Sequence, residues 1–579
     1  MKLIEALEIV RKETPAEARA FRVSLVCGFT PAHLQTFLHA NLKQVLPDRN
    51  VAISAGLYGD FWGTLQNAHV QNPDAIVVAM EWSDLDPRLG LRSLGSWAPD
   101  VFDDILRGVR ARVLQFKEIS QGKTLHIPIA ISGPTLPLPP VSFAAGWSAS
   151  EFELSLRVEL SSLLLHANRS KNIRIMNAQR LDQLSPLANR LDVKSELASG
   201  FPYKIPHASV VAELLSLLTQ PPSPKKGLIT DLDDTVWSGI LGEVGAPGLT
   251  WALENNSHMH GVYQKLLNAL AETGALIAAA SKNDIKLVQE ALRREDLILR
   301  SENVFPVEAH WGPKSESLAR ILKTWNIGTN AVVFIDDSPM ELAEVKAAYP
   351  EVECILFPKD DPQAIEGLLH RLRDLFGKNA LSEEDALRGE SIRRAHETDA
   401  ATIAHGSVSE EFLKQADAEI SLDFSKQPLD PRALELVNKT NQFNLNGRRY
   451  TEKEWQDFVG NSSSILSVVS YRDKYGPLGK IAVLSGHLNN HSLRVDTWVM
   501  SCRAFSRRIE YKCLEELFLR FHLEDIILDF TATAKNGPTC EFLETLLGTE
   551  PLPQCRISRK VFFERRLESF HRVREPKNG

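Results

Sequence analysis

Short apolar runs alternate with stretches of helical spacing through the middle of the chain. The apolar runs lie at 227–230, 275–280, 331–335 and 352–357, and the helical stretches lie at 262–272 and 318–325. Strands that alternate with helices form a parallel sheet with helices on both faces. The pattern therefore predicts an α/β domain, to which we assign residues 221–376.

The first part of the chain shows the same alternation. Buried strands are expected at 21–26, 75–79, 125–132 and 173–176, with helices at 31–46 and 148–167. The segment QPPSPKKG (220–227) is rich in proline, which extends neither a helix nor a central strand. Residues 1–220 are therefore predicted to form a separate α/β unit.

The last part of the chain follows a different order. Three strands are expected in succession before a long helix, then one more strand and a last helix: 465–471, 480–487, 493–500, 508–519, 526–530 and 541–547. Charged and small residues interrupt the apolar pattern at 377–390. A run of strands followed by helices is typical of an α+β domain, which we assign to residues 377–579.

Composition narrows the class of protein further. The 579 residues include 66 basic and 74 acidic side chains, a net charge of −8, which argues against a strongly basic nucleic-acid binder. None of the six cysteines forms a C-x-x-C pair, so the sequence signals neither a zinc site nor a disulfide framework. The longest apolar run is far shorter than the roughly 20 residues of a membrane span. We expect a soluble, cytoplasmic protein without nucleic-acid or membrane partners.

Polar residues follow three of the strands expected in the middle domain. Asp231 follows the first strand, Ser281 the second and Asp336 the third. In open α/β sheets, ligands bind beyond the carboxyl ends of the strands. These three side chains are therefore expected around one crevice.

The residue types at this crevice suit the transfer of a phosphoryl group. In Asp231-Leu232-Asp233, one carboxylate is placed to attack phosphorus and the other to exchange a proton with the leaving oxygen. Mg²⁺ prefers carboxylate and phosphate oxygens, while a lysine and a hydroxyl stabilise the remaining oxygens. Taken alone, the D-x-D-x-T pentapeptide also fits a turn or a strand cap.

The order of these motifs resembles that of the haloacid dehalogenase (HAD) superfamily. The resemblance implies a Rossmann-like parallel sheet, with Asp231 as nucleophile and Asp233 as general acid/base. It further implies that Thr235 supports the nucleophile loop, that Ser281 is the second-motif hydroxyl and that Lys314, in the polar loop WGPKSES, is the third-motif lysine. The metal, Mg²⁺, would be held by four acids: Asp231, Asp233 (through its backbone carbonyl), Asp336 and Asp337.

A narrower resemblance covers nearly the whole chain. The motifs DLDDTVWSGILGEVG (231–245), HWGPKSESL (310–318) and FIDDSPMELAEV (334–345) are similar to FkbH-like proteins. LVNKTNQFNLNGRRYT (436–451) and AKNGPTCEFLETLLG (534–548) resemble the GNAT-like C-terminal region of that family, and residues 27–34 resemble its SGNH-like N-terminal region.

The FkbH-like resemblance implies a specific reaction. The enzyme would dephosphorylate an acyl phosphate, 1,3-bisphosphoglycerate, and load a glyceryl group onto the phosphopantetheine thiol of an acyl carrier protein in polyketide or related biosynthesis. The alternatives are a HAD phosphatase that acts on a small phosphorylated metabolite without acyl transfer, and a non-catalytic scaffold. The intact carboxylates argue against the scaffold.

The sequence departs from the family pattern in each of its three parts. Ala280 stands where many members carry a cysteine just before the second-motif serine, so a thioester at that position is impossible. The stretch 503–509 lacks the glycine that lets backbone N–H groups approach the pyrophosphate of acyl-CoA. Gly28-Phe29-Thr30 lacks the serine of an active SGNH hydrolase, and His207 is expected to be a loop residue.

Three further residues are candidates for contact with an acyl group or a carrier protein. Cys502 is expected at a strand end next to an arginine, which would favour the thiolate, although a buried cysteine is the more ordinary interpretation. Asn438 and Asn441 belong to a polar cluster at a helix end. Capping and turn formation are the alternative role for both asparagines.

Overall fold

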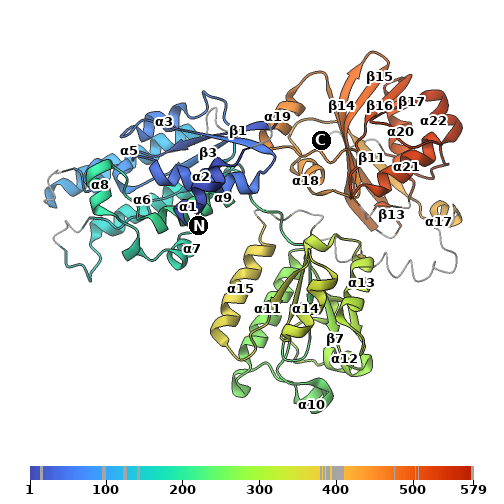
Figure 1. Cartoon of the computed structure of the whole chain (residues 1–579), viewed down its shortest axis with the longest axis horizontal. Coiled ribbons are helices and arrows are strands. Elements are labelled where there is room, and N and C mark those ends of the chain that lie inside the picture. Colours follow the sequence, from blue (N-terminus) through green and yellow to red (C-terminus); the bar gives the residue numbers. More distant parts are fainter. Residues whose placement is uncertain are drawn as a thin grey trace. The chain divides into compact units, whose positions relative to one another are not determined.

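In a computed structural model, the residues that the structure describes form three separate β-sheets (Figure 1). The structure describes every residue except 14–16, 94–98, 121–126, 140–143, 379–380, 382–384, 386–391, 394–409, 475, 502–503, 506 and 575–579. Two compact units are present: Met1–Pro222 with Thr451–Asp457, and Ser223–Tyr450 with Phe458–Gly579. Each sheet lies within one of the three predicted ranges, whose boundaries stay a prediction. Among the described residues, no helix is both long and apolar enough to cross a lipid bilayer.

The first sheet is parallel and has the strand order β2-β1-β3-β4-β5. Its strands are β1 (Arg19–Val26), β2 (Arg49–Ala55), β3 (Ala75–Ala79), β4 (Ile129–Ser132) and β5 (Ile173–Ile175). The accompanying helices are α1 (Leu3–Arg11), α2 (Ala32–Val45), α3 (Phe61–Asn67), α4 (Trp82–Leu85), α5 (Phe102–Ser120), α6 (Glu151–Ala167), α7 (Ala178–Leu184), α8 (Val193–Ser199) and α9 (Ile205–Thr219). Helices α2 and α9 share one core with the sheet, and α5 and α6 share the other.

The second sheet carries the candidate site. Its strands are β6 (Gly227–Thr230), β7 (Leu276–Ser281), β8 (Val304–Ala309), β9 (Val332–Asp336) and β10 (Glu353–Leu356), all parallel in the order β10-β9-β6-β7-β8. Its helices are α10 (Leu241–Gly248), α11 (His258–Glu272), α12 (Ile285–Leu292), α13 (Lys314–Trp325), α14 (Pro339–Ala348) and α15 (Pro362–Phe376).

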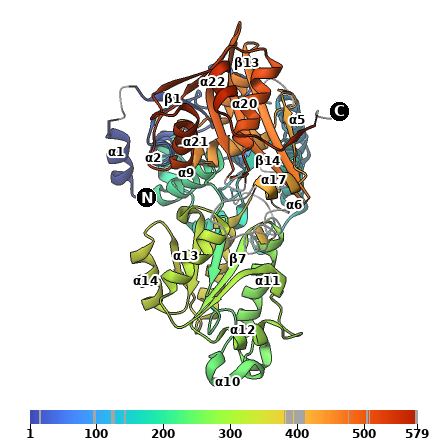
Figure 2. The same ribbon diagram turned by 90° about the vertical axis from the view of Figure 1, so that its right-hand side faces the viewer.

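Alternate residues of each strand in this sheet enter different cores. Leu228 of β6 packs in the core that includes α11 and α15, whereas Ile229 packs in the core that includes α13 and α14. The two helix pairs lie on opposite sides of the sheet (Figures 1 and 2). Strands buried on both faces read as continuous apolar runs, which is why they were visible in the sequence.

The third sheet is mainly antiparallel and has the order β17-β16-β15-β14-β13-β11-β18, with β12 paired to β15. Its strands are β11 (Glu419–Asp423), β12 (Phe443–Asn444), β13 (Ser464–Asp473), β14 (Gly476–Asn489), β15 (Ser492–Met500), β16 (Asp525–Asp529), β17 (Gln554–Ser558) and β18 (Arg572–Val573). The helices of this part are α17 (Glu410–Gln415), α18 (Pro431–Lys439), α19 (Glu452–Gly460), α20 (Ile509–Arg520), α21 (Gly537–Leu547) and α22 (Arg559–Arg565).

Two features of the second sheet differ from expectation. Lys314 is not in a loop but begins α13, directly after Pro313, because proline before a first turn sacrifices no helical N–H bond. Strand β8 was not predicted, since it contains Pro306 and only some of its residues are buried. An edge strand tolerates a proline, and β8 is the edge of its sheet.

Candidate active site

The crevice forms where β6, β7 and β9 end. Thr230 of β6 lies opposite Ala279 of β7 and Ile335 of β9, and the backbone N–H of Asp231 donates to the Ile335 carbonyl over 2.8 Å. The register therefore places Asp231 beside Asp336 on one side and Ala280 on the other. Neighbouring strands are about 4.8 Å apart, so the three positions are direct neighbours.

A compact turn follows Asp231. The Leu232 carbonyl accepts the N–H groups of three residues: Thr235, Val236 and Trp237. Asp234 adopts a left-handed backbone (φ 49°), which aspartate tolerates better than most residues. The turn thus brings residues 235–237 back toward the start of the loop.

Helix α11 anchors this turn from behind. His260 Nδ1 lies 3.0 Å from the Thr235 carbonyl, and Gln264 Nε2 donates to the Val236 carbonyl over 2.8 Å. Both side chains are buried, and they lie four residues apart on one face of the helix. The loop that carries the first two candidate acids is therefore fixed to the body of the domain.

Lys314 lies between two of the candidate acids. Its Nζ is 2.6 Å from Asp231 Oδ1 and 2.7 Å from Asp336 Oδ2, and all three side chains are at least nine-tenths buried. Burial raises the pKa of Asp231 and of Asp336, and the ammonium group of Lys314, which the two carboxylates share, only partly opposes that rise. The pKa of Lys314 is also raised, since the two carboxylates outweigh the effect of its burial.

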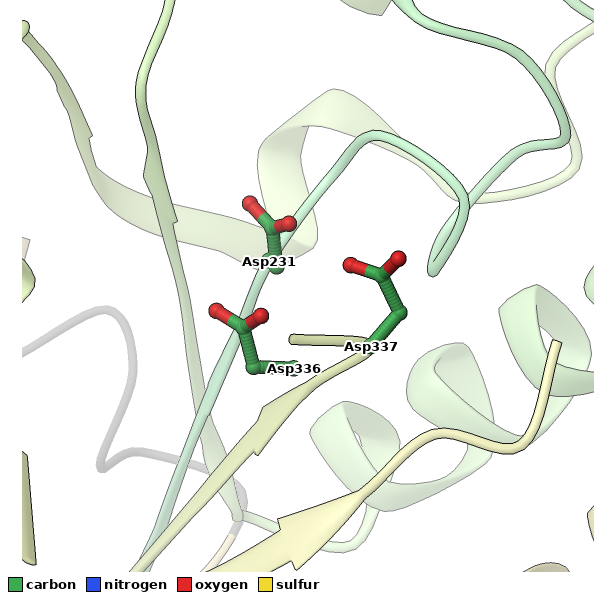
Figure 3. A group of neighbouring side chains, drawn as sticks. All are labelled: Asp231, Asp336 and Asp337. Atoms are coloured by element: carbon green, nitrogen blue, oxygen red, sulfur yellow. The ribbon is translucent and has the colours of Figure 1, made fainter. Parts of the chain in front are cut away.

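Three carboxyl groups gather at the ends of β6 and β9 (Figure 3). Asp231, Asp336 and Asp337 each offer an oxygen, and these oxygens lie within 4.8 Å of one another. Three negative charges beside one lysine leave an excess that a divalent cation would compensate, and an all-oxygen donor set suits Mg²⁺. The residues therefore fit the metal expected from the sequence, although Asp337 also pairs with Lys359 at 2.9 Å.

Asp233 lies outside this carboxylate group and has partners of its own. Trp237 Nε1 donates to its Oδ1 and Asn283 Nδ2 donates to its Oδ2, each over 2.9 Å. Asn283 Nδ2 also lies 2.9 Å from Ser281 Oγ, so the second-motif hydroxyl and the candidate acid/base share one amide. Ser281 is buried.

Thr235 is fully buried in the same loop. Its Oγ1 makes no hydrogen bond to the residues that the structure describes. The hydroxyl therefore does not brace the Asp231 loop in this structure. Its supporting role stays a prediction.

Several residues of this crevice were missed by sequence reasoning. Trp237 lies within the quoted motif 231–245, and Asn283 follows two residues after Ser281, but neither side chain is itself a reactive type. Lys359 joins Asp234 and Asp337 at 2.7 and 2.9 Å, and Lys282 joins Glu341 at 2.6 Å. A lysine two residues beyond the end of a predicted strand was the available signal for both Lys359 and Lys282.

Ala280 is fully buried among the residues that pack beneath α13 and α14. Side chains alternate along a strand, so Ala280 lies on the same side of the sheet as Asp231 and Lys314. A thiol at this position would therefore be next to the candidate nucleophile, as the family resemblance implies for other members.

The candidate contacts in the last part of the chain have internal partners or cannot be placed. Asn438 bonds through both amide atoms to the backbone of Tyr450, at 2.8 and 2.9 Å. Asn441 Oδ1 accepts from Arg449 over 2.5 Å. These bonds are what the structural alternative predicts. Cys502 lies outside the described residues.

His207 is a helix residue of α9 rather than a loop residue. It is fully buried, and its ring nitrogens lie 3.0 Å from Thr135 Oγ1 and 2.9 Å from Ser185 Oγ. The wrong expectation came from Pro206, which sits in the first helical turn, where proline is well tolerated.

Comparison with known proteins gives a match among solved structures. No family model and no curated protein matches the sequence. A solved structure shares the fold. It is the N-terminal part of the protein BF1531 from Bacteroides fragilis, which contains a phosphatase domain and was crystallised in complex with Mg. The identity is 18%, the match covers 66% of this chain and 100% of that chain, and the TM-score is 0.53.

A second solved structure, MurG from Acinetobacter baumannii, matches at 11% identity over 65% of this chain and 99% of that chain. Its TM-score of 0.12 is too low for a structural argument. The BF1531 match supports the α/β fold with parallel sheets that the sequence predicted. The SGNH-like and GNAT-like assignments of the flanking parts stay predictions.

Proposed function

We propose that the chain is a Mg²⁺-dependent phosphatase of the HAD type that acts on a phosphorylated small molecule. The observation that carries the proposal is the position of Lys314, shared between Asp231 and Asp336 at 2.6 and 2.7 Å. A buried ammonium beside a strand-end carboxylate is suited to hold the oxygens of a phosphoryl group. The neighbouring BF1531 structure, with its phosphatase domain and Mg, supports the same chemistry.

In this proposal, each residue of the crevice has one task. An Asp231 oxygen attacks phosphorus, and the bond from phosphorus to the leaving oxygen breaks as Asp233 gives that oxygen a proton. Asp233 then takes a proton from water, which attacks phosphorus and releases Asp231. Lys314 and Ser281 hold the phosphoryl oxygens. Bound at Asp231, Asp336 and Asp337, Mg²⁺ supplies positive charge to the nucleophile and the phosphate.

The decisive experiment is the Asp231→Asn variant. The amide keeps the shape of the side chain but is no nucleophile, so we expect phosphate release to fall by at least about 10³-fold. Inorganic phosphate is measured with and without Mg²⁺, and EDTA is expected to abolish release by the wild type. Asp296→Asn, at an exposed aspartate paired with Arg294, is the matched control. If Asp231→Asn retains most of the activity, the proposal is wrong.

A finer proposal concerns acyl transfer. The motifs shared with FkbH-like proteins, in all three parts of the chain, support the loading of a glyceryl group from 1,3-bisphosphoglycerate onto an acyl carrier protein. Since Ala280 has no thiol, the pantetheine thiol of the carrier would attack the acyl phosphate directly. The alternative is simple hydrolysis of a small phosphorylated metabolite by the same Asp231 chemistry.

Intact-mass analysis of carrier proteins separates these two alternatives. We expect glyceryl on the carrier only when holo-carrier, donor and enzyme are present together, with no stable acyl-enzyme beside Ser281. Loading that survives removal of free donor would indicate a covalent intermediate elsewhere, and Cys502 is the first residue to test. Rapid phosphate release without any loading favours the simple phosphatase. Ala280→Cys is expected to create a thioester that can be trapped.

A further inference from the structure

The carboxyl group of Asp233 is held at both of its oxygens. Trp237 Nε1 donates to Oδ1 and Asn283 Nδ2 to Oδ2, each over 2.9 Å. The Trp237 side chain is fully buried, and Asn283 is 3% exposed. Water therefore has little access to either donor, and the two bonds fix the plane of the carboxyl group.

The two donors come from different elements that are themselves anchored. The turn in which the Trp237 N–H donates to the Leu232 carbonyl places Trp237 beside Asp233. His260 and Gln264 of α11 contact the backbone of this turn. Asn283 follows β7 and immediately precedes Asp284, which caps α12. The orientation of Asp233 is thus set from two directions by rigid parts of the domain.

We propose that Trp237 and Asn283 are positioning residues, which hold Asp233 where it exchanges a proton with the leaving oxygen. The inference rests on the proposed phosphatase function, in which Asp233 is the acid and base. Each carboxyl oxygen that accepts one hydrogen bond keeps a second lone pair, which carries the transferred proton. Asn283 Nδ2 also contacts Ser281 Oγ. The same amide therefore links the orientation of the Asp233 carboxyl group to the hydroxyl that would hold a phosphoryl oxygen.

This role predicts an effect that depends on the leaving group. An alkoxide leaves phosphorus only when it is protonated, so an alkyl phosphate needs a well-placed Asp233. A p-nitrophenolate leaves without protonation and needs it much less. Loss of a positioning bond therefore slows the departure of the leaving group from the alkyl phosphate much more than from p-nitrophenyl phosphate. A merely structural role would slow both substrates equally.

The test compares wild type with Trp237→Phe and Asn283→Ala on glycerol phosphate and p-nitrophenyl phosphate. We expect kcat/KM, which reports the steps up to departure of the leaving group, to fall about tenfold more for glycerol phosphate than for p-nitrophenyl phosphate in each variant. Folding is checked by circular dichroism and thermal unfolding.

Two matched controls lie in the same domain. Trp251→Phe removes an indole N–H that donates to the Asp296 carbonyl over 3.2 Å, and Asn268→Ala removes an amide that donates to the Ile298 carbonyl over 2.7 Å. In both control variants, activity on glycerol phosphate and activity on p-nitrophenyl phosphate are expected to fall equally or not at all.

Equal losses on both substrates in folded Trp237→Phe and Asn283→Ala, or no loss, overturn the inference. If one variant does not fold, the other decides. A wild-type enzyme that releases phosphate from neither ester overturns the proposed function, and the inference with it. That failure is distinguishable because it appears before any substitution is made.

Discussion

The first and second sheets both carry buried polar side chains at their carboxyl ends, but the two groups differ in how their charges are balanced. Beyond β3 and β4, Glu81 is 3% exposed and accepts hydrogen bonds from Thr135 Oγ1 over 2.6 Å and Tyr203 over 2.7 Å. Thr135 also bonds His207, which in turn bonds Ser185. We call this group closed, because each of these side chains makes hydrogen bonds to other members of the group.

The crevice of the second sheet is not closed in this way. Asp231, Asp336 and Asp337 bring three carboxylates together; Lys314 pairs with the first two, and the partly exposed Asp337 pairs with Lys359. Such a group is completed by a cation and an anion from outside. The comparison teaches that polar residues at strand ends are not sufficient to indicate a site, and that several carboxylates gathered around one buried lysine are the stronger sign.

The largest effect that tests this difference is expected from Lys314→Met. It leaves Asp231 and Asp336 buried without a counter-charge, and breaking a buried ion pair costs about 3–5 kcal/mol. We expect a lower unfolding temperature and loss of phosphate release, with part of the stability restored by Mg²⁺. Differential scanning calorimetry measures the change, and Lys323→Met on the exposed side of the same helix is the control. Equal stability of the two variants would contradict the ion-pair interpretation.

The closed group is expected to respond to pH. Burial raises the pKa of Glu81 from 4.5 to about 7, despite its hydrogen bonds from Thr135 and Tyr203. A raised carboxyl pKa contributes stability that is fully present below 4.5 and is lost as pH rises through 7. The loss amounts to about 3 kcal/mol.

Hydrogen exchange of the amides in β3 and β4, corrected for the intrinsic rate, measures this loss between pH 5 and pH 8. The Glu81→Gln variant does not ionise, so its protection is expected to vary less with pH. If wild type and variant show the same pH dependence, Glu81 does not carry the effect.

Replacing one buried threonine in each group gives a smaller, paired test. Thr135→Val removes hydrogen bonds to Glu81 and His207 and is expected to cost about 2 kcal/mol. Thr235→Val removes a hydroxyl with no bond to the described residues, so we expect a change below about 1 kcal/mol. Denaturant unfolding measures both. A reversed order would show that the hydroxyl of Thr235 has a partner in solution.

The smallest effect is expected from Ala280→Cys. The added sulfur enters a close-packed core beneath α13, at a cost of about 1 kcal/mol. Because the position is fully buried, the new thiol is expected to react slowly with a thiol reagent in the absence of substrate. Rapid labelling would indicate that this part of the crevice opens more readily than its packing implies.

The sequence allowed the core of the fold to be predicted because its strands are buried on both faces. Strand β6 was expected at the residues where the structure has it, and Asp231 and Asp336 could be placed by their positions directly after apolar runs. Two of the edge strands, β2 and β8, gave no such signal. In β2, exposed and buried residues are mixed, and β8 contains a proline.

Contacts between loops could not be predicted in the same way. Trp237 reaches Asp233 only because the Leu232 carbonyl gathers three N–H groups into one turn. Glu81 and Tyr203 are 122 residues apart, so nothing local links them. Sequence patterns report burial and period, whereas these partnerships depend on the path of the chain between elements.

The bond between Lys314 and Asp231 has a consequence for how a catalytic cycle begins. The ammonium group of Lys314 lies 2.6 Å from Oδ1 of Asp231, the nucleophile in the proposed reaction. A phosphate that enters the crevice must draw the ammonium toward its own oxygens before Asp231 is free to react. In the proposed phosphatase, substrate binding would therefore exchange one carboxylate partner of Lys314 for a phosphoryl oxygen.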